Sequence, residues 1–323
     1  MEKHIKIALL GFGTVGRGTY RVLTENADVI TKRTGLYIDV ARILEINPVA
    51  IKCGLAPEEI FTQNIEDILN DPEIVAVAEV MGGMEPAATF MLRCMEAGKS
   101  VVTPNKAVVA ARYEEFHETA RSHGVEFRYE ASAGGAIPVI EVIRRSLWAN
   151  KFTRIQGILN GTTNYILTKM DEEDMSYEDA LKQAQANGFA ERDPSADVEG
   201  IDTANKLTIL MVEAFGVYIA PGDIDRTGIT HVTKDDILAA ASRGCKIRLI
   251  ATAEQAEDGS IIASVKPEEI PLHNPLATVR NEFNAVLLSC NMADDIFLQG
   301  RGAGQDPTGS AVASDLLAIC TAV

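Results

Sequence analysis

The segment 184–206 combines five carboxylates with one lysine, a set of side chains that can bind an ammonium group and move a proton. Asp202 and Lys206 are four residues apart, so they share one face if the segment is helical. Taken alone, such a pair is most often a solvent-exposed contact at the start of a helix. In the functional alternative, the acids hold a substrate ammonium group while Lys206 handles a proton or a carboxylate. The acids are Glu191, Asp193, Asp197, Glu199 and Asp202.

A second lysine ends the segment Thr103-Pro104-Asn105-Lys106. This segment follows a predicted strand of a parallel sheet, so Lys106 is expected to project from the carboxyl edge of that sheet. Ligands bind at this edge in open α/β folds. A solvated loop lysine and a functional lysine are both consistent with the placement.

Two further loops are rich in polar or small residues. The segment 160–164 (Asn-Gly-Thr-Thr-Asn) follows a predicted strand, and it can bind a small carboxylate or cap a helix. The segment 130–138 is glycine-rich and lies at an expected domain junction. It can act as a hinge or offer backbone carbonyls to a cation, and both interpretations stay open for each loop.

A glycine-rich loop follows the apolar run at residues 5–10. It reads Gly11-Phe12-Gly13-Thr14-Val15-Gly16 and is followed by apolar residues at helical spacing. Between a buried strand and a helix, this pattern predicts a dinucleotide site: the glycines allow a tight turn, close approach of a pyrophosphate and close packing of helix on strand. The helix N-terminus supplies N–H groups for the phosphates. The purely structural alternative is a tight turn that binds no ligand.

The end of the second predicted strand indicates which dinucleotide is used. An acid there binds the ribose 2′-hydroxyl of NAD, whereas an arginine accommodates the 2′-phosphate of NADP. Glu45 occupies this place and favours NAD. It lies further from Gly16 than the usual spacing, and Arg42 stands within the strand.

The candidate functional residues lie in two predicted domains of different fold class. Up to about residue 130, apolar strands alternate with helices, which predicts a Rossmann-type doubly wound parallel sheet of the α/β class. Later segments predict an α+β domain with long helices near 177–187 and 199–215, and a final apolar helix at 310–320. We expect a dinucleotide-binding domain at 1–130 with 300–323, and a catalytic, substrate-binding and dimerisation domain at 131–299.

Composition excludes several classes of protein. The chain has 323 residues, 46% of them hydrophobic, and a net charge of −16, which disfavours nucleic acid as a partner. No apolar run approaches the roughly 20 residues that a membrane span requires. The five cysteines form no CxxC pair, which predicts free thiols in a reducing cytoplasm and no zinc or disulfide framework.

Together these segments make the chain resemble the homoserine dehydrogenases over residues 5–320. The run 184–206 fits the signature spacing of that family. Further family-like segments are GFGTVG, TPNK, EASAGGAIP, NGTTNYILTKM, NEFNAV and GRGAG. The resemblance implies that the C-terminal helix returns to the nucleotide-binding domain.

The resemblance also implies roles for individual residues. Lys206 corresponds to the catalytic lysine, Asp202 to its partner, and Lys106 to a second lysine between nicotinamide and substrate. Substrate contacts are implied for Glu191, Asp197, Gly161, Thr162 and Lys106. Dinucleotide contacts are implied for Gly11, Phe12, Gly13, Thr14, Val15, Gly16, Glu45, Thr103, Lys106 and Gly302. The backbone carbonyls of Glu130, Ala133, Gly135 and Ile137 match a monovalent-cation site that usually holds sodium.

The activity implied is the interconversion of L-homoserine and L-aspartate 4-semialdehyde with NAD or NADP, in threonine, methionine and isoleucine biosynthesis, by a cytoplasmic homodimer. Many members carry a basic residue where Ile46 stands, and together with Glu45 this departure favours NAD or the use of both dinucleotides. Many also continue into an ACT domain, whereas this sequence ends at Val323, so no threonine feedback through such a domain is expected. Two alternatives are a catalytically silent dinucleotide sensor and a dehydrogenase of a related amino or hydroxy acid.

Overall fold

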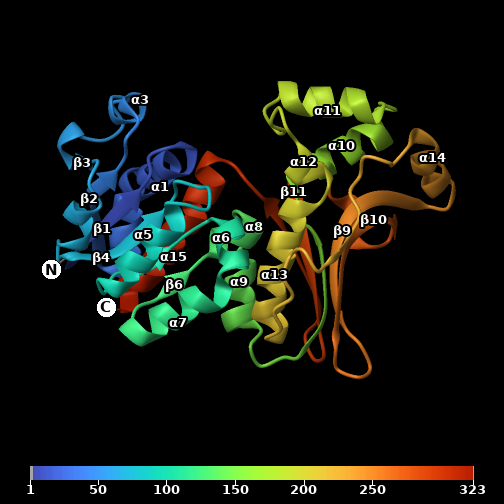
Figure 1. The fold of residues 1–323 in the computed structure, drawn as a ribbon. Helices are drawn as coiled ribbons and strands as arrows, with labels where there is room; N and C mark the ends of the chain where they lie inside the picture. The colour runs from blue at the N-terminus through green and yellow to red at the C-terminus, as the bar shows by residue number, and fades with distance from the viewer. Residues whose placement is uncertain (1–2, 323) are drawn as a thin grey trace. The chain divides into compact units, whose positions relative to one another are not determined.

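The apolar run near the N-terminus forms a central strand of a six-stranded sheet in the computed structural model, which describes residues 3–322 (Figure 1). The strand order is β3-β2-β1-β4-β5-β6, and every pairing is parallel. The order reverses between β1 and β4, and ligands of open α/β sheets bind outside the carboxyl ends of the strands at such a point. The strands are β1 (Lys3–Leu10), β2 (Leu36–Leu44), β3 (Phe61–Thr62), β4 (Ile74–Glu79), β5 (Ser100–Val102) and β6 (Phe127–Arg128).

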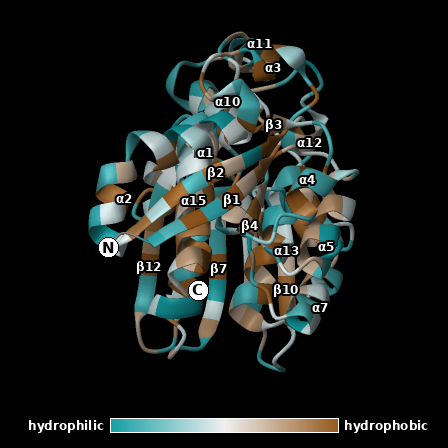
Figure 2. Cartoon of the chain, turned by 90° about the vertical axis from the view of Figure 1, so that its left-hand side faces the viewer, coloured by the Kyte–Doolittle hydropathy of each residue, from teal (hydrophilic) through white to brown (hydrophobic). Residues whose placement is uncertain are grey.

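Helices connect these strands, and the C-terminal helix joins the same unit. One buried cluster contains Ile5, Ile7 and Leu9 of β1 together with Leu316 and Ile319 of the C-terminal helix. Figure 2 shows hydrophobic residues on the strands of this sheet and on that helix. The predicted return of the C-terminal helix to the dinucleotide-binding unit is therefore confirmed. The helices are α1 (Thr14–Glu25), α2 (Ala27–Thr34), α3 (Pro48–Ile51), η1 (Glu58–Ile60), α4 (Glu66–Leu69), α5 (Ala87–Glu96), α6 (Lys106–Ala111), α7 (Tyr113–His123), α8 (Glu130–Gly134) and α15 (Gln305–Ala322).

A second unit is built on a mixed sheet with strand order β12-β11-β7-β9-β10-β8. Its pairings are antiparallel except for β10 with β8, as expected for the α+β part of the chain. The strands are β7 (Phe152–Ile158), β8 (Asp225–Arg226), β9 (Cys245–Gln255), β10 (Ile261–Pro271), β11 (Phe283–Cys290) and β12 (Asp294–Arg301). The helices are α9 (Val139–Glu141), η2 (Val142–Ser146), α10 (Gly161–Glu172), α11 (Tyr177–Ala186), α12 (Ser195–Val198), α13 (Ile201–Phe215), α14 (Lys234–Ser242) and η3 (Pro275–Thr278).

The chain divides at two points, so that Met1–Ala136 with Ala303–Val323 form one unit and Ile137–Gly302 the other. The first division lies beyond residue 130 because α8 belongs with the C-terminal helix: the Glu130 backbone N–H donates to Asp315 Oδ2 at 2.8 Å. Within residues 3–322, no helix is long and apolar enough to cross a membrane.

Some element limits differ from the sequence-based expectation. Helix α13 begins at Ile201, and not at 199, because Gly200 precedes it with a left-handed φ of +78°. Such a backbone angle is unfavourable for residues with a Cβ. Helix α15 begins at Gln305, well before the expected start at 310. The glycine-rich segment 130–138 starts as the short helix α8, and its Gly135 has a φ of +59°.

Candidate active site

The lysine–aspartate pair of α13 is buried. Lys206 Nζ lies 2.7 Å from Asp202 Oδ2 and 2.7 Å from the Leu159 carbonyl oxygen, and both residues are 7% exposed. The interpretation of a solvent-exposed ion pair is therefore wrong. Removing two charges from water costs several kcal/mol unless their contacts compensate. A buried ion pair next to the end of a strand is therefore a candidate for a functional site.

Local sequence explains how this pair is presented. On α13 the spacing of four residues brings Asp202 and Lys206 to one face. The acceptor Leu159 directly follows β7, so the sheet fixes the position of its carbonyl group relative to the helix. Leu207, Ile209 and Leu210 are fully buried and anchor α13 against the rest of its unit.

Asn160 extends the pair into a network. Its Nδ2 donates to Asp202 Oδ2 at 2.9 Å and to Asp197 Oδ1 at 2.7 Å, while its Oδ1 accepts from the Thr163 backbone N–H and caps α10. Sequence reasoning identified the polar loop but gave Asn160 no role of its own. The available signal was its position, because a helix-capping asparagine stands here two residues after a strand and directly before a glycine.

Burial changes the acidity of Asp197. Its pKa is raised above the ordinary value of 3.8, chiefly because partial burial disfavours the charged carboxylate. The hydrogen bond from Asn160 opposes this effect, the negative charge of Asp202 adds to it, and the charge of Lys206 opposes it. A cationic ligand beside this carboxyl group would offset the cost of burying its charged form.

We expect Asp197→Asn to change how the free energy of unfolding depends on pH. The folded protein binds the Asp197 proton more tightly than the unfolded chain, so stability falls as the pH rises from 3.8 through the raised pKa. Asparagine carries no charge, so the variant should gain stability over the parent protein between acidic and neutral pH. Urea unfolding at several pH values measures this, and an identical pH dependence of the two proteins would contradict it.

The other expected substrate residues lie around this network, and the Thr162 side chain also forms a hydrogen bond with the Asp197 carboxyl group, which lowers the pKa of Asp197. Thr162 is 7% exposed, and its hydroxyl group donates to the Phe189 carbonyl at 2.6 Å. Gly161 is the first residue of α10, and a Cβ there would lie 2.7 Å from the Glu282 carbonyl oxygen, so the position requires glycine. Glu191 is exposed in the loop before α12, and its carbonyl oxygen accepts from Gln185 Nε2.

The glycine loop of the first unit has the geometry that a dinucleotide needs. Gly11 has a φ of +103°, and a Cβ at Gly16 would lie 2.4 Å from the Gly11 carbonyl oxygen. In contrast, a Cβ at Gly13 would meet no atom within 4 Å, so this exposed backbone is open to a ligand. Thr14 and Val15 begin α1, and Phe12 packs its ring against Tyr20 and Phe61. We conclude that the loop fits a pyrophosphate group.

Glu45 lies directly after β2 and contacts this loop. Its Oε2 accepts from the Phe12 backbone N–H at 2.8 Å, and its Oε1 accepts from the N–H groups of Ile46 and Asn47, each at 2.9 Å. Arg42 lies within β2 and donates to the Ala41 carbonyl. The residue beside the glycine loop at the end of the second strand is therefore an acid.

Thr103 and Lys106 stand at the carboxyl end of β5. The Thr103 side chain is fully buried, and its hydroxyl group donates to Glu79 Oε2 at 2.6 Å. Lys106 is the first residue of α6 and is half-buried. Thr103 thus lies in the loop after β5, and Lys106 begins the helix that follows this loop, as expected for residues at the carboxyl edge of the sheet.

Gly302 lies directly after β12 in the second unit. A Cβ there would lie 1.9 Å from Asn284 Nδ2, so the amide group rests on the glycine backbone. Asn284 is 1% exposed, and within residues 3–322 neither of its side-chain polar atoms has a hydrogen-bond partner. An orphaned buried amide fits a site that receives a polar ligand group.

The expected cation site has no cluster of acidic, histidine or cysteine side chains. No group of three or more such residues that could hold a metal ion is found within residues 3–322. The Ile137 carbonyl oxygen accepts a hydrogen bond from the Val139 N–H at 2.8 Å. A carbonyl oxygen has two lone pairs, so the second one can still contact a cation. Any cation here would depend on carbonyl groups of the segment 130–137, as the sequence suggested.

A parallel sheet with a glycine loop at the reversal of its strand order, and a second unit that buries a lysine–aspartate pair, define a nicotinamide-dependent oxidoreductase. Two family models match the chain: "Homoserine dehydrogenase, NAD binding domain" over residues 11–130 and "Homoserine dehydrogenase" over residues 138–317. The chain belongs to the homoserine dehydrogenase family. It is an NAD(P)-dependent enzyme of the class that acts on the CH–OH group of homoserine, so the silent sensor is set aside.

Individual relatives agree with the family models. Homoserine dehydrogenase of Mycobacterium leprae is 41% identical over 98% of this chain and 72% of its own length. The crystal structure of a homoserine dehydrogenase from Thiobacillus denitrificans has a TM-score of 0.94 and 41% identity, over 99% of this chain and 74% of that one. A hyperthermophilic archaeal homoserine dehydrogenase mutant in complex with NADPH has a TM-score of 0.81 and 26% identity, over 99% and 98%.

Proposed function

We propose that Lys206 moves the proton that accompanies hydride transfer between L-homoserine and L-aspartate 4-semialdehyde. The observation that carries this assignment is the buried contact of Lys206 Nζ with Asp202 and with the Leu159 carbonyl. A lysine ammonium has three N–H donors, so these two contacts orient it. During reduction it gives a proton to the developing alkoxide, and in the reverse direction the neutral amine accepts the hydroxyl proton. A bound dinucleotide supplies or accepts the hydride.

The same unit offers groups for the rest of the substrate. We propose that Asp197 and Glu191 bind its ammonium group. The support for Asp197 is its link through Asn160 to Asp202, and the support for Glu191 is its place on the loop that Thr162 holds at Phe189. We assign Gly161 and Thr162, at the start of α10, to direct substrate contacts, and Lys106 to a second contact with the reacting groups.

For the dinucleotide, the residues present fit NAD. We propose that Glu45 accepts hydrogen bonds from the ribose hydroxyl groups, because its carboxylate sits beside the glycine loop and each of its oxygens has further acceptor capacity. Gly11, Phe12, Gly13, Thr14, Val15 and Gly16 form the pyrophosphate loop. Thr103, Lys106 and Gly302 are proposed further contacts.

Three finer assignments rest on membership of the family. We propose that the carbonyls of Glu130, Ala133, Gly135 and Ile137 bind sodium, since they lie within one short segment that includes a sharp turn at Gly135. We propose a homodimer that serves threonine, methionine and isoleucine synthesis. We also propose that it works in the cytoplasm, where its five free cysteines stay reduced.

An absorbance assay tests the proposed function. The purified protein is mixed with L-homoserine at alkaline pH, with NAD and NADP in parallel, and the reduced nicotinamide is followed. We expect turnover with both dinucleotides and a higher kcat/KM with NAD. Folded protein that binds NAD but turns over a different amino alcohol or hydroxy acid in a substrate screen would redirect the substrate assignment.

We expect Glu45→Gln to lower the ratio of kcat/KM for NAD to that for NADP by about tenfold, the equivalent of one charge-assisted hydrogen bond. Glutamine keeps one of the two oxygens that accept from the backbone N–H groups, and it removes the charge that repels a 2′-phosphate. The exposed Glu59→Gln in the same unit is the matched control. An unchanged ratio would show that Glu45 does not choose the dinucleotide.

A further inference from the structure

Glu79 ends β4, at the point where the strand order of the parallel sheet reverses. It is the only carboxylate residue with no exposed surface among the buried residues of the described chain 3–322. All three groups at its carboxylate are donors. Oε1 accepts from the N–H groups of Met81 (2.8 Å) and Gly82 (3.0 Å), and Oε2 accepts from the Thr103 hydroxyl group (2.6 Å).

These contacts continue toward Lys106. Thr103 Oγ1 accepts from the Asn105 backbone N–H at 3.0 Å. The Asn105 side chain donates to the Gly83 carbonyl at 2.6 Å, and its Oδ1 accepts from the Val108 N–H at the start of α6. Two loops, one after β4 and one after β5, are thereby tied together at the residue that precedes Lys106.

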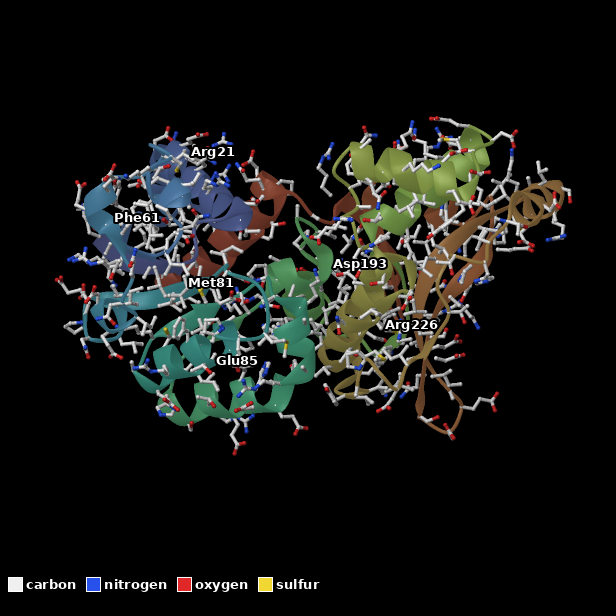
Figure 3. All side chains as sticks on the ribbon, turned by 45° about the horizontal axis from the view of Figure 1, so that its top comes forward. Arg21, Phe61, Met81, Glu85, Asp193 and Arg226 are labelled. Atoms are coloured by element: carbon white, nitrogen blue, oxygen red, sulfur yellow. The ribbon has the colours of Figure 1, made fainter. Side chains whose placement is uncertain are left out.

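The loop after β4 also borders the glycine loop. A Cβ at Gly11 would lie 3.0 Å from the Met81 backbone nitrogen and 3.0 Å from its Cα, so Met81 sits directly against this glycine. Figure 3 labels Met81 among the side chains of this unit. A shift of the loop would therefore change the space available beside the dinucleotide loop.

Capping a turn with a buried carboxylate carries a large free-energy cost of desolvation. Burying an ionised group costs more than burying a neutral one, and the strand before Glu79 is otherwise apolar. A neutral side chain could satisfy the two N–H groups of the loop. The carboxylate is distinguished by accepting from two separate loops at once, which gives strong, directional contacts.

We propose that Glu79 is a positioning residue for the reaction: it holds the Met81 loop against Gly11 and, through Thr103 and Asn105, fixes the start of the helix that carries Lys106. We assign Glu79 no direct contact with substrate or dinucleotide. The inference rests on the proposed role of Lys106.

The test compares Glu79→Gln with Glu73→Gln, which removes a carboxylate from an exposed ion pair with Lys6 in the same unit. In Glu79→Gln the amide NH₂ would face Thr103 Oγ1, so the link to the second loop is weakened. We expect kcat to fall about tenfold, as for a displaced reacting group. The dissociation constant for reduced dinucleotide, measured by nicotinamide fluorescence, should rise severalfold. Glu73→Gln should change neither quantity.

Further variants separate the possible failures. In a Lys106→Met background, Glu79→Gln should lower kcat little further, because residues that act as a unit are not additive. If Lys106→Met is impaired while Glu79→Gln matches Glu73→Gln, only the inference about Glu79 is overturned. If Lys106→Met keeps full activity, the proposed role of Lys106 fails and the inference fails with it. A lower Tm for Glu79→Gln with unchanged kcat and dinucleotide affinity would show a purely structural role.

Discussion

Lys206→Met will lower kcat for homoserine oxidation by about 10²–10⁴-fold while leaving the affinity for NAD near that of the parent protein. We expect this loss because Lys206 is the only group to which we assign proton transfer. Affinity should be retained because the glycine loop and Glu45 belong to the other unit of the chain. Methionine is preferred to alanine because it fills the space of the buried lysine stem.

Folding must be separated from chemistry in this experiment, because removing one partner of a buried ion pair leaves the other charge uncompensated. Asp202 keeps its hydrogen bond from Asn160 in the variant, which limits that cost. The exposed Lys182→Ala serves as a control for loss of a lysine in the same unit. Near-normal kcat in folded Lys206→Met would refute the assignment. If Tm and activity fall together, the loss of activity could come from unfolding. The kcat of Asp202→Asn, measured by the same assay, then decides the assignment.

The dinucleotide loop was predictable from sequence because its determinants are local. An apolar strand, a glycine with positive φ and a helix start follow one another directly, and the structure places them so at Gly11 and α1. Glu45 was correctly placed at the end of the second strand despite its unusual distance from Gly16. The structure explains that distance, since two helices, α1 and α2, separate β1 from β2.

The buried state of the Lys206–Asp202 pair could not be predicted in the same way. The spacing of Asp202 and Lys206 is typical of exposed helix pairs as well, and only the long-range packing of α13 on the end of β7 distinguishes the two cases. Asn160 and Glu79 were missed for a similar reason. Their side chains connect segments that are distant in sequence, so no local pattern reveals the contacts.

The C-terminal helix was predicted from the sequence, and the family resemblance implied that it packs on the nucleotide-binding domain. The close contact with α1 that holds it there is visible only in the structure. Helix α15 crosses α1 at two glycines. A Cβ at Gly18 would lie 2.1 Å from the Gln305 carbonyl oxygen, and a Cβ at Gly309 would lie 2.4 Å from the Gly18 carbonyl carbon. The helices can approach so closely only because neither glycine carries a side chain.

We therefore expect Gly309→Val to destabilise the dinucleotide-binding unit by about 3 kcal/mol or more, because valine would press on backbone atoms that cannot move aside like a side chain. For a unit of this size the Tm should fall by roughly 6–12 °C. Ser310→Val, at an exposed position of the same helix, controls for the lower helix propensity of valine and should shift the Tm far less. Because α15 packs next to β1 and the glycine loop begins where β1 ends, NAD should also protect the variant less than the parent protein against thermal unfolding. Equal Tm values for the two valine variants would mean that the close helix crossing contributes little to stability.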